Sequence, residues 1–188
     1  MKRVPLSILS VALMAFFLGC ATLSKNECLE ADWFEIGRKD GSLGKPRALF
    51  QKHMDACTKH GISPNSEAYY AGRDEGLRIY CSEENGFEQG RLGRKYQHVC
   101  PLDLEPEFLA GFYAGREIYE YRSKVASLEK QLKTIENQIK DKEKDLRSSK
   151  LSNKERAIIR SEIKSLDVEY RDVVRQLISL AETKPFTD

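Results

Sequence analysis

The sequence predicts a mainly α-helical fold, in which a small disulfide-stapled helical body with glycine-rich helix packing precedes a C-terminal antiparallel coiled-coil hairpin. Three features predict it: glycines that recur with aromatic residues at helical spacing, four cysteines between residues 28 and 100, and heptad repeats in the last third of the chain. With 188 residues, the chain is long enough for one domain of ordinary size and an appendage.

The first nineteen residues have the features of a leader peptide. A basic start precedes an apolar run from Val4 to Leu18 that is too short to span a bilayer. The run ends in Phe17-Leu18-Gly19-Cys20, which resembles a bacterial lipoprotein signal box. The resemblance implies cleavage before Cys20 and lipidation of its thiol and new amino group. An ordinary secretory leader that is cleaved elsewhere is the alternative.

The segment after Cys20 predicts where the folded part lies. Residues 21–27 are polar and reach at most about 25 Å when fully extended, so the body is expected close to the membrane. Ala21 stands where aspartate commonly signals inner-membrane retention, and this resembles outer-membrane sorting. We therefore expect a lipid-anchored protein on the periplasmic face of the cell outer membrane.

The charge balance argues against a nucleic-acid partner. The leader carries two basic and no acidic residues, so removing it leaves 29 of the 31 Lys and Arg residues, against 29 Asp and Glu. A nucleic-acid binder needs a basic excess to meet the phosphates. The expected contacts are instead the membrane, through the lipid on Cys20, and an envelope protein, through the C-terminal arm.

Four cysteines remain once Cys20 is assigned to lipidation. An even number in an exported chain indicates a disulfide framework, and four cysteines allow three connectivities that spacing alone does not distinguish. We favour the two pairings that each close a local helical hairpin, which are Cys28–Cys57 and Cys81–Cys100.

Glycines follow aromatic residues at helical spacing. Each glycine inside a helix costs about 1 kcal/mol relative to alanine, so close helix–helix approach is the expected compensation. The offsets of three and four place the glycines on one helix stripe. The predicted helix-packing residues are Gly37 and Gly41 after Phe34, Gly72 and Gly76 after Tyr69, and Gly111 and Gly115 after Phe108, with a degraded copy at Phe87, Gly90 and Gly93.

The main alternative makes these copies β-hairpins, because Asp40-Gly41 and Asn85-Gly86 are strong turn signals. The helical interpretation is supported by residues that are typical of helix starts and ends. Pro46 and Pro106 fit helix starts, Gly61 fits a helix end, and Ser66 is a plausible N-cap.

Two heptad segments predict the hairpin. A break at residues 147–150 and a capping box from Ser152 to Glu155 separate them, so the two helices must run antiparallel. Pairing Ile139 with Leu166 and Leu146 with Ile159 sets the register, whereas a one-heptad slip would place Lys142 against Arg156. The seams are Val125, Leu128, Leu132, Ile135, Ile139, Lys142 and Leu146, and then Ile159, Ile163, Leu166, Tyr170, Val173, Leu177 and Leu180.

Candidate catalytic and metal-binding residues do not form a recognisable motif. His53, Cys57 and His60 share a helix face, which His98 and Cys100 could complete as a metal site, but the even cysteine count favours disulfides. His53 is expected to be half-buried and His60 exposed. The carboxylates that could serve hydrolysis are Asp32, Asp40, Asp74, Glu75 and Glu117, of which Asp74 and Glu75 are expected on a solvated edge. No catalytic constellation, metal or cofactor is predicted.

The body resembles a known but uncharacterised family, a domain-of-unknown-function group of Gram-negative cell-envelope lipoproteins. The similarity spans roughly residues 20–120 and leaves the arm outside. It implies a location in the envelope and no activity. The residues that carry it are Cys28, Asp32-Trp33, Asp40-Gly41, Gly72, Gly76, Tyr80-Cys81, Gly86, Gly90, Gly93, Tyr96 and Cys100-Pro101.

The sequence therefore predicts a lipoprotein with a structural or protein-interaction role in the envelope. A cell-wall or envelope hydrolase is the first alternative, which a pocket holding two carboxylates, or a histidine with a carboxylate, would favour. A metal-binding periplasmic lipoprotein is the second. The expected parts are a leader (1–19), a lipidated tether (20–27), a body rich in glycine, aromatic residues and cysteine (28–121), a helical hairpin (122–183) and a tail (184–188).

Overall fold

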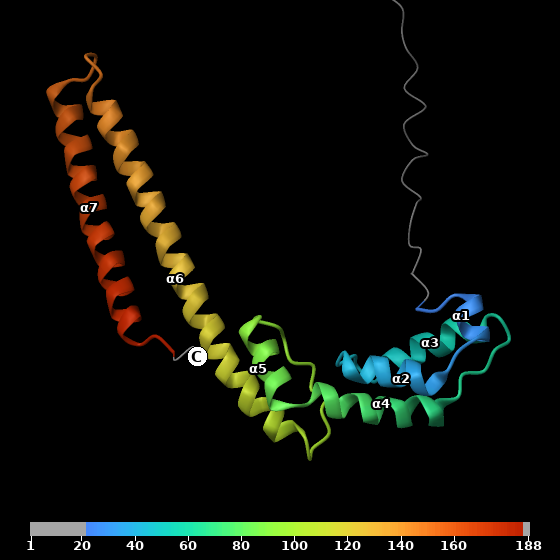
Figure 1. Ribbon diagram of the computed structural model, residues 1–188. Helices are drawn as coiled ribbons and strands as arrows, with labels where there is room; N and C mark the ends of the chain where they lie inside the picture. The colour runs from blue at the N-terminus through green and yellow to red at the C-terminus, as the bar shows by residue number, and fades with distance from the viewer. Residues whose placement is uncertain (1–21, 186–188) are drawn as a thin grey trace, which may run out of the picture. The chain divides into compact units, whose positions relative to one another are not determined.

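The computed structural model describes residues 22–185, and within this range it contains helices and no strand. The mainly α fold class is therefore confirmed, and the β-hairpin alternative is wrong. The leader, Cys20 and residues 186–188 lie outside the described residues. The helices are α1 (Lys25–Leu29), α2 (Trp33–Ser42), α3 (Leu49–Thr58), α4 (Ser66–Tyr80), α5 (Glu83–Arg91), α6 (Glu105–Leu146) and α7 (Asn153–Glu182) (Figure 1).

The chain divides into two compact units, with the boundary between Ile79 and Tyr80 at the end of α4. Unit 1 contains α1 to α4, and unit 2 contains α5 to α7. The region 28–121, which the sequence predicts as one body, is thus shared between two units.

In unit 1, α2 and α4 are in backbone contact at four glycines. A Cβ atom added to Gly37 would lie 1.9 Å from the carbonyl oxygen of Tyr69, and one added to Gly72 would lie 1.9 Å from that of Phe34. The contacts advance together along both helices, so α2 and α4 run parallel, and α3 returns the chain between them. One turn later, Gly41 and Gly76 repeat the contacts against the carbonyl groups of Arg73 and Arg38.

In unit 2, α5 and α6 make the same contact in the same register. A Cβ atom on Gly111 would lie 2.0 Å from the carbonyl oxygen of Glu83, and one on Gly86 would lie 2.1 Å from that of Phe108. In both units a glycine faces the carbonyl group three residues before the partner helix's first glycine. The second pair, Gly90 and Gly115, faces the carbonyl groups of Phe112 and Phe87.

The degraded copy predicted at Phe87, Gly90 and Gly93 does not match the residues that make the helix contact. The third copy is Glu83, Gly86 and Gly90, with the same offsets as the others. Gly93 has φ 69° and ends the helix, as Gly44 with φ 62° ends α2, because glycine adopts the left-handed conformation without a steric penalty. The chain therefore contains an internal repeat of parallel glycine-packed helix pairs.

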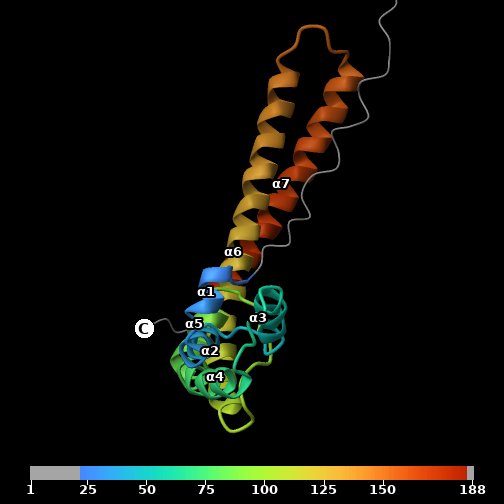
Figure 2. The same cartoon turned by 90° about the vertical axis from the view of Figure 1, so that its right-hand side faces the viewer.

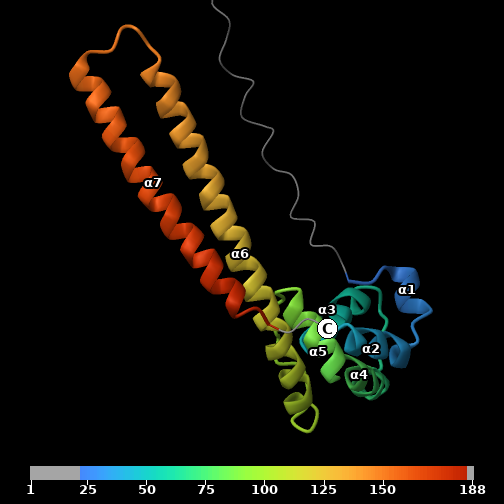
Figure 3. The ribbon, with the colours of Figure 1, turned by 60° about the vertical axis from the view of Figure 1, so that its left-hand side comes forward.

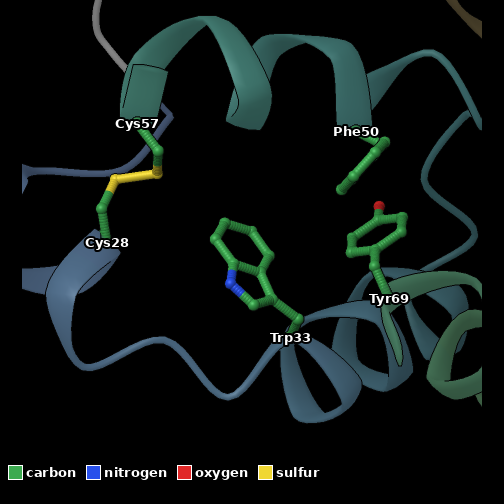
Figure 4. Close-up of a cluster of buried hydrophobic side chains, with 5 residues drawn as sticks. All are labelled: Cys28, Trp33, Phe50, Cys57 and Tyr69. Atoms are coloured by element: carbon green, nitrogen blue, oxygen red, sulfur yellow. A yellow bond between two sulfur atoms is a disulfide. The ribbon is translucent and has the colours of Figure 1, made fainter. Parts of the chain in front are cut away.

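The described part of each unit contains one disulfide. Cys28 pairs with Cys57 in unit 1 and Cys81 with Cys100 in unit 2, at Cα–Cα distances of 5.5 and 5.7 Å, which is the connectivity that the sequence favours. In unit 1 the bridge ties α1 to α3. Figure 4 shows the Trp33 ring between this bridge and Phe50, and the Phe50 and Tyr69 ring centroids are 4.5 Å apart.

Beyond the glycine contact, α6 continues and pairs with α7, and the two helices lie side by side in Figure 1, Figure 2 and Figure 3. Lys142 Nζ lies 2.6 Å from Glu162 Oε2, and the Tyr170 hydroxyl donates to Glu136 at 3.3 Å. Both contacts fit the predicted register and exclude the one-heptad slip. The apolar cluster consists of Leu128, Leu132, Ile135, Ile139, Leu166, Tyr170, Val173, Leu177 and Leu180.

The turn of the hairpin is held by polar contacts at both helix ends. Ser152 and Glu155 form the predicted capping box. From α7, the Arg156 guanidinium donates to the carbonyl oxygens of Leu146 and Ser148 and so satisfies groups at the end of α6. At another predicted cap, α4 begins at Ser66, but the side chain of Asn65 accepts from Ala68 N at 3.0 Å, so the predicted cap is wrong by one residue.

Replacing Ser152 by alanine is expected to lower the unfolding free energy of the hairpin by about 1 kcal/mol, because the first turn of α7 loses its cap. Chemical denaturation of the variant measures the change. Ser161→Ala is the control: it removes an exposed hydroxyl in the same helix and should be neutral or slightly stabilising. Equal effects of both substitutions would contradict the role of the cap.

Candidate functional site

Unit 1 buries a cluster of polar side chains between α2, α3 and α4. Asp40, His53 and Arg73 are 9%, 5% and 3% exposed, and Tyr69 is fully buried. Asp40 lies beside Gly41 in the last turn of α2, His53 faces inward from α3 together with Phe50 and Cys57, and Tyr69 lies three residues before Gly72 on α4. The close α2–α4 packing therefore brings these groups together. We name Thr22, Asp40, His53 and Tyr69 the polar cluster of unit 1.

Hydrogen bonds connect the polar cluster in one chain. His53 Nε2 lies 3.0 Å from Asp40 Oδ2, and His53 Nδ1 lies 2.8 Å from the hydroxyl oxygen of Thr22. The Tyr69 hydroxyl donates to the same Asp40 oxygen at 2.8 Å. The histidine ring is thus held at both nitrogens, and the carboxylate is held by two donors.

The electrostatics keep Asp40 ionised. Burial acts to raise the pKa of Asp40, but hydrogen bonds from His53 and Tyr69 and the nearby positive charge of Lys45 outweigh it, so the pKa lies below its usual value of 3.8. Burial and the Asp40 carboxylate both raise the pKa of Tyr69, so its hydroxyl stays protonated and remains a donor.

An open pocket of about 740 Å³ borders this cluster, and Thr22, Asp40 and His53 line it. Its rim is acidic. Three of the rim carboxylates have local partners, since Glu27 accepts from Ser24 N in a capping box, Asp32 caps α2 and Glu35 pairs with Arg38 at 2.6 Å. The charged residues of the rim are Glu27, Glu30, Asp32, Glu35, Arg38 and Lys39.

Arg73 is a second buried polar feature of unit 1. One of its guanidinium nitrogens donates to the carbonyl oxygen of Lys45 at 2.6 Å, while Nε and Nη1 have no hydrogen-bond partner. Burial lowers the pKa of this arginine. In unit 2, Arg116, one turn beyond the position that aligns with Arg73, donates to the carbonyl oxygen of Arg94 at 2.7 Å.

The internal repeat shows that helix packing does not require the polar cluster. Aligning the repeats on their first glycines places Phe108 of α6 at the position of Tyr69, Phe112 at that of Arg73, and Gln89 of α5 at that of Asp40. Phe108 and Phe112 stack at a ring-centroid distance of 5.9 Å. The same glycine contact therefore closes over an apolar core in unit 2 and over a polar one in unit 1.

The residues considered as candidate metal ligands do not converge. Cys57 and Cys100 are in separate disulfides, His60 is exposed, and His98 lies near Glu105 with most of its side chain exposed. Between residues 22 and 185, no three His, Cys, Asp or Glu side chains are grouped so that they could hold a metal ion.

The candidate carboxylates have different environments. Asp74, Glu75 and Glu117 are exposed, Asp32 is a helix cap, and only Asp40 is buried with a histidine. His53, which the sequence predicts as half-buried, is buried. The sequence analysis missed the hydroxyl partners Thr22 and Tyr69, and nothing in their local pattern could have indicated that they meet His53 and Asp40.

Acidification is expected to reduce the stability of unit 1 through Asp40. Because its folded pKa lies below the unfolded value, the stabilisation is present above about pH 4 and is lost as the pH falls through the folded pKa. Denaturant unfolding of the wild type and of Asp40→Asn should therefore differ near neutral pH and converge as the pH falls below the folded pKa of Asp40. Asp74→Asn, which removes an exposed carboxylate, should leave the pH dependence unchanged. A constant gap between wild type and Asp40→Asn would contradict this account.

Comparison with known proteins gives a family-model match over the repeat region. Residues 32–117 match the model of a family described as "Protein of unknown function (DUF2799)". The matched segment begins at the N-cap of α2 and ends in α6 just beyond Gly115, so it contains both glycine contacts and excludes α7. No curated protein and no solved structure matches the chain. The match supports an uncharacterised domain family for this region.

Proposed function

We propose that this protein is a lipoprotein of the Gram-negative outer membrane, anchored through Cys20, with a structural or protein-interaction role on the periplasmic face. The two disulfides carry the proposal. Disulfides persist in oxidising compartments and are rare in the cytosol, so paired cysteines agree with an exported chain. The leader ending in Leu18-Gly19-Cys20 adds the lipid anchor. None of the helices in residues 22–185 is long and apolar enough to cross a bilayer.

The α6–α7 hairpin is the proposed docking element for an envelope protein, and we propose that it packs as a coiled coil. Its apolar cluster lies between the two helices. Three apolar side chains of α7, Ile158, Val168 and Ile178, are instead about half exposed. They offer contact points to a partner without disturbing the intrahairpin seam.

Metabolic labelling with a radioactive fatty acid tests the anchor. Cells expressing the wild type should give a labelled band that fractionates with the outer membrane. Cys20→Ala should lose the label and leave the membrane fraction, because the acyl chains supply the membrane affinity. Recovery of unlabelled wild-type protein in the cytoplasm with reduced cysteines would contradict the proposal.

Crosslinking in cells tests the role of the arm. Deletion of residues 123–183 removes α7 and most of α6 but leaves all eight glycines of the helix contacts and both disulfides. Partners captured by the wild type should be lost on deletion and weakened by Val168→Glu and Ile178→Glu. An unchanged set of crosslinked partners would reduce the arm to a spacer.

A further inference from the structure

We propose that Thr22, His53 and Asp40 form a hydrolytic site in unit 1 that cleaves a carboxylic ester bearing a positive charge, with Thr22 as nucleophile. The proposal concerns an activity, and it does not depend on where the protein is located or on what the hairpin binds. It rests on the order of the hydrogen bonds, on the pocket that exposes them, and on the internal repeat.

The hydrogen bonds define the position of each proton. Asp40 is an ionised carboxylate that already accepts from Tyr69, so it carries no proton to give, and His53 Nε2 must donate to it. In the neutral ring, Nδ1 then has a free lone pair. In that tautomer the Thr22 hydroxyl, whose oxygen lies 2.8 Å from Nδ1, is within range to donate to the lone pair. A hydroxyl, an acceptor imidazole and an orienting carboxylate are the three parts of an activated nucleophile.

The reactive groups have access to a substrate. Thr22 is partly exposed, and Thr22, His53 and Asp40 all line the pocket of about 740 Å³, a volume in the range of small-molecule sites. Tyr69 lies on the buried side of Asp40, so it is a positioning residue. The pocket therefore opens on Thr22, and the supporting side chains of His53 and Asp40, which also line it, are largely buried.

The charges of the pocket select the substrate class. Five carboxylates line it, those of Glu27, Glu30, Asp32, Glu35 and Asp40, against the two cations Arg38 and Lys39. This excess favours a ligand with a positive group, such as a quaternary or protonated amine, near the scissile carbonyl. An anionic ester would be repelled.

The reaction balances without a cofactor. Thr22 Oγ1 attacks the carbonyl carbon and forms a C–O bond, while its proton passes to His53 Nδ1. The bond to the alcohol oxygen then breaks, and that oxygen takes the proton from His53, leaving acyl-Thr22. Water attacks the acyl carbon and gives a proton to His53, the bond to Thr22 breaks, and the proton returns to Oγ1. One ester and one water yield one acid and one alcohol.

The repeat argues against a purely structural role. Unit 2 builds the same glycine contact with Phe108 and Phe112 in place of Tyr69 and Arg73, so the fold does not need a buried carboxylate at this position. Burying a carboxylate costs desolvation energy that an apolar core avoids. Thr22, His53 and Asp40 are therefore an addition to the repeat that is specific to unit 1.

Hydrolysis of acetylcholine by the purified protein, followed by acid release, tests the site, and 3,3-dimethylbutyl acetate is the uncharged control of equal shape. The wild type should hydrolyse the cationic ester faster than the uncharged one. Thr22→Ala and His53→Gln should each lower kcat/KM by about 10²–10⁴-fold, while Thr22→Ser should retain the activity. Tyr69→Phe should change the pH profile of kcat, because Asp40 loses a donor.

A second readout separates loss of folding from loss of chemistry. A fluorophosphonate probe should label Thr22, as located by mass spectrometry, and the label should be absent in His53→Gln that melts as a folded protein. No acid release above buffer and no label on the folded wild type would overturn the proposal. Equal rates of Thr22→Ala and wild type would overturn the role of Thr22, and equal rates for the two esters would overturn the charge selection.

Discussion

Replacing Gly72 by alanine is expected to destabilise unit 1 by on the order of 3–5 kcal/mol, far more than an ordinary helix substitution. The added Cβ atom would lie 1.9 Å from the carbonyl oxygen of Phe34, and the atoms on both sides of this contact belong to backbone. A flexible side chain could rotate away, but two helices can relieve the clash only by separating. Separation would also open the packing around Tyr69.

Thermal unfolding monitored by circular dichroism measures this effect, with Gly111→Ala as the matched variant in unit 2, where the Cβ atom would lie 2.0 Å from the carbonyl oxygen of Glu83. Ala71→Leu is the control, because Ala71 is exposed on the same helix one residue away. It should change stability by less than about 0.5 kcal/mol. A wild-type melting temperature for Gly72→Ala would show that α2 and α4 are not in backbone contact.

Removal of either disulfide is expected to cost about 3–4 kcal/mol in the chain-entropy model, since the bridges close loops with sequence separations of 29 and 19 residues. The Cys28→Ser, Cys57→Ser double variant should destabilise unit 1, and the Cys81→Ser, Cys100→Ser double variant should destabilise unit 2. Replacing both members of a pair avoids leaving a free thiol.

Denaturant unfolding in the presence and absence of a reductant measures the contribution of the bridges. The reductant should lower the midpoint of the wild type and leave a variant that lacks all four cysteines unaffected. Cys20→Ser is the control, because this residue precedes the described part of the chain and has no predicted partner in the disulfide framework. Full retention of stability in reductant would indicate that the bridges do not form.

Local sequence rules predict most of this chain correctly. The seams of the hairpin, the capping box at Ser152 and the helix end at Gly61 depend on residues a few positions apart. Such patterns can be recognised in the sequence because helix geometry fixes which residues, three and four positions apart, lie on the same face. The third glycine copy is predicted in the wrong place because the aromatic residue Phe87 resembles the start of a copy. The observed contact uses Gly86 and Gly90, and the carbonyl groups of Glu83 and Phe87 lie against α6.

Sequence patterns by themselves indicated the helical class, the glycine stripes and the two seams of the hairpin, and they favoured, without fixing, the cysteine pairs and the hairpin register that the structure shows. Only the tertiary structure decided that the body is two units and that a histidine meets a carboxylate and a hydroxyl. His53 is 31 residues from Thr22 and 13 from Asp40 in the sequence, and Asp40 is 29 residues from Tyr69. No helical or strand period encodes such distances, because they follow from how close two glycine-lined helices can approach and from where the connecting helix α3 then places His53.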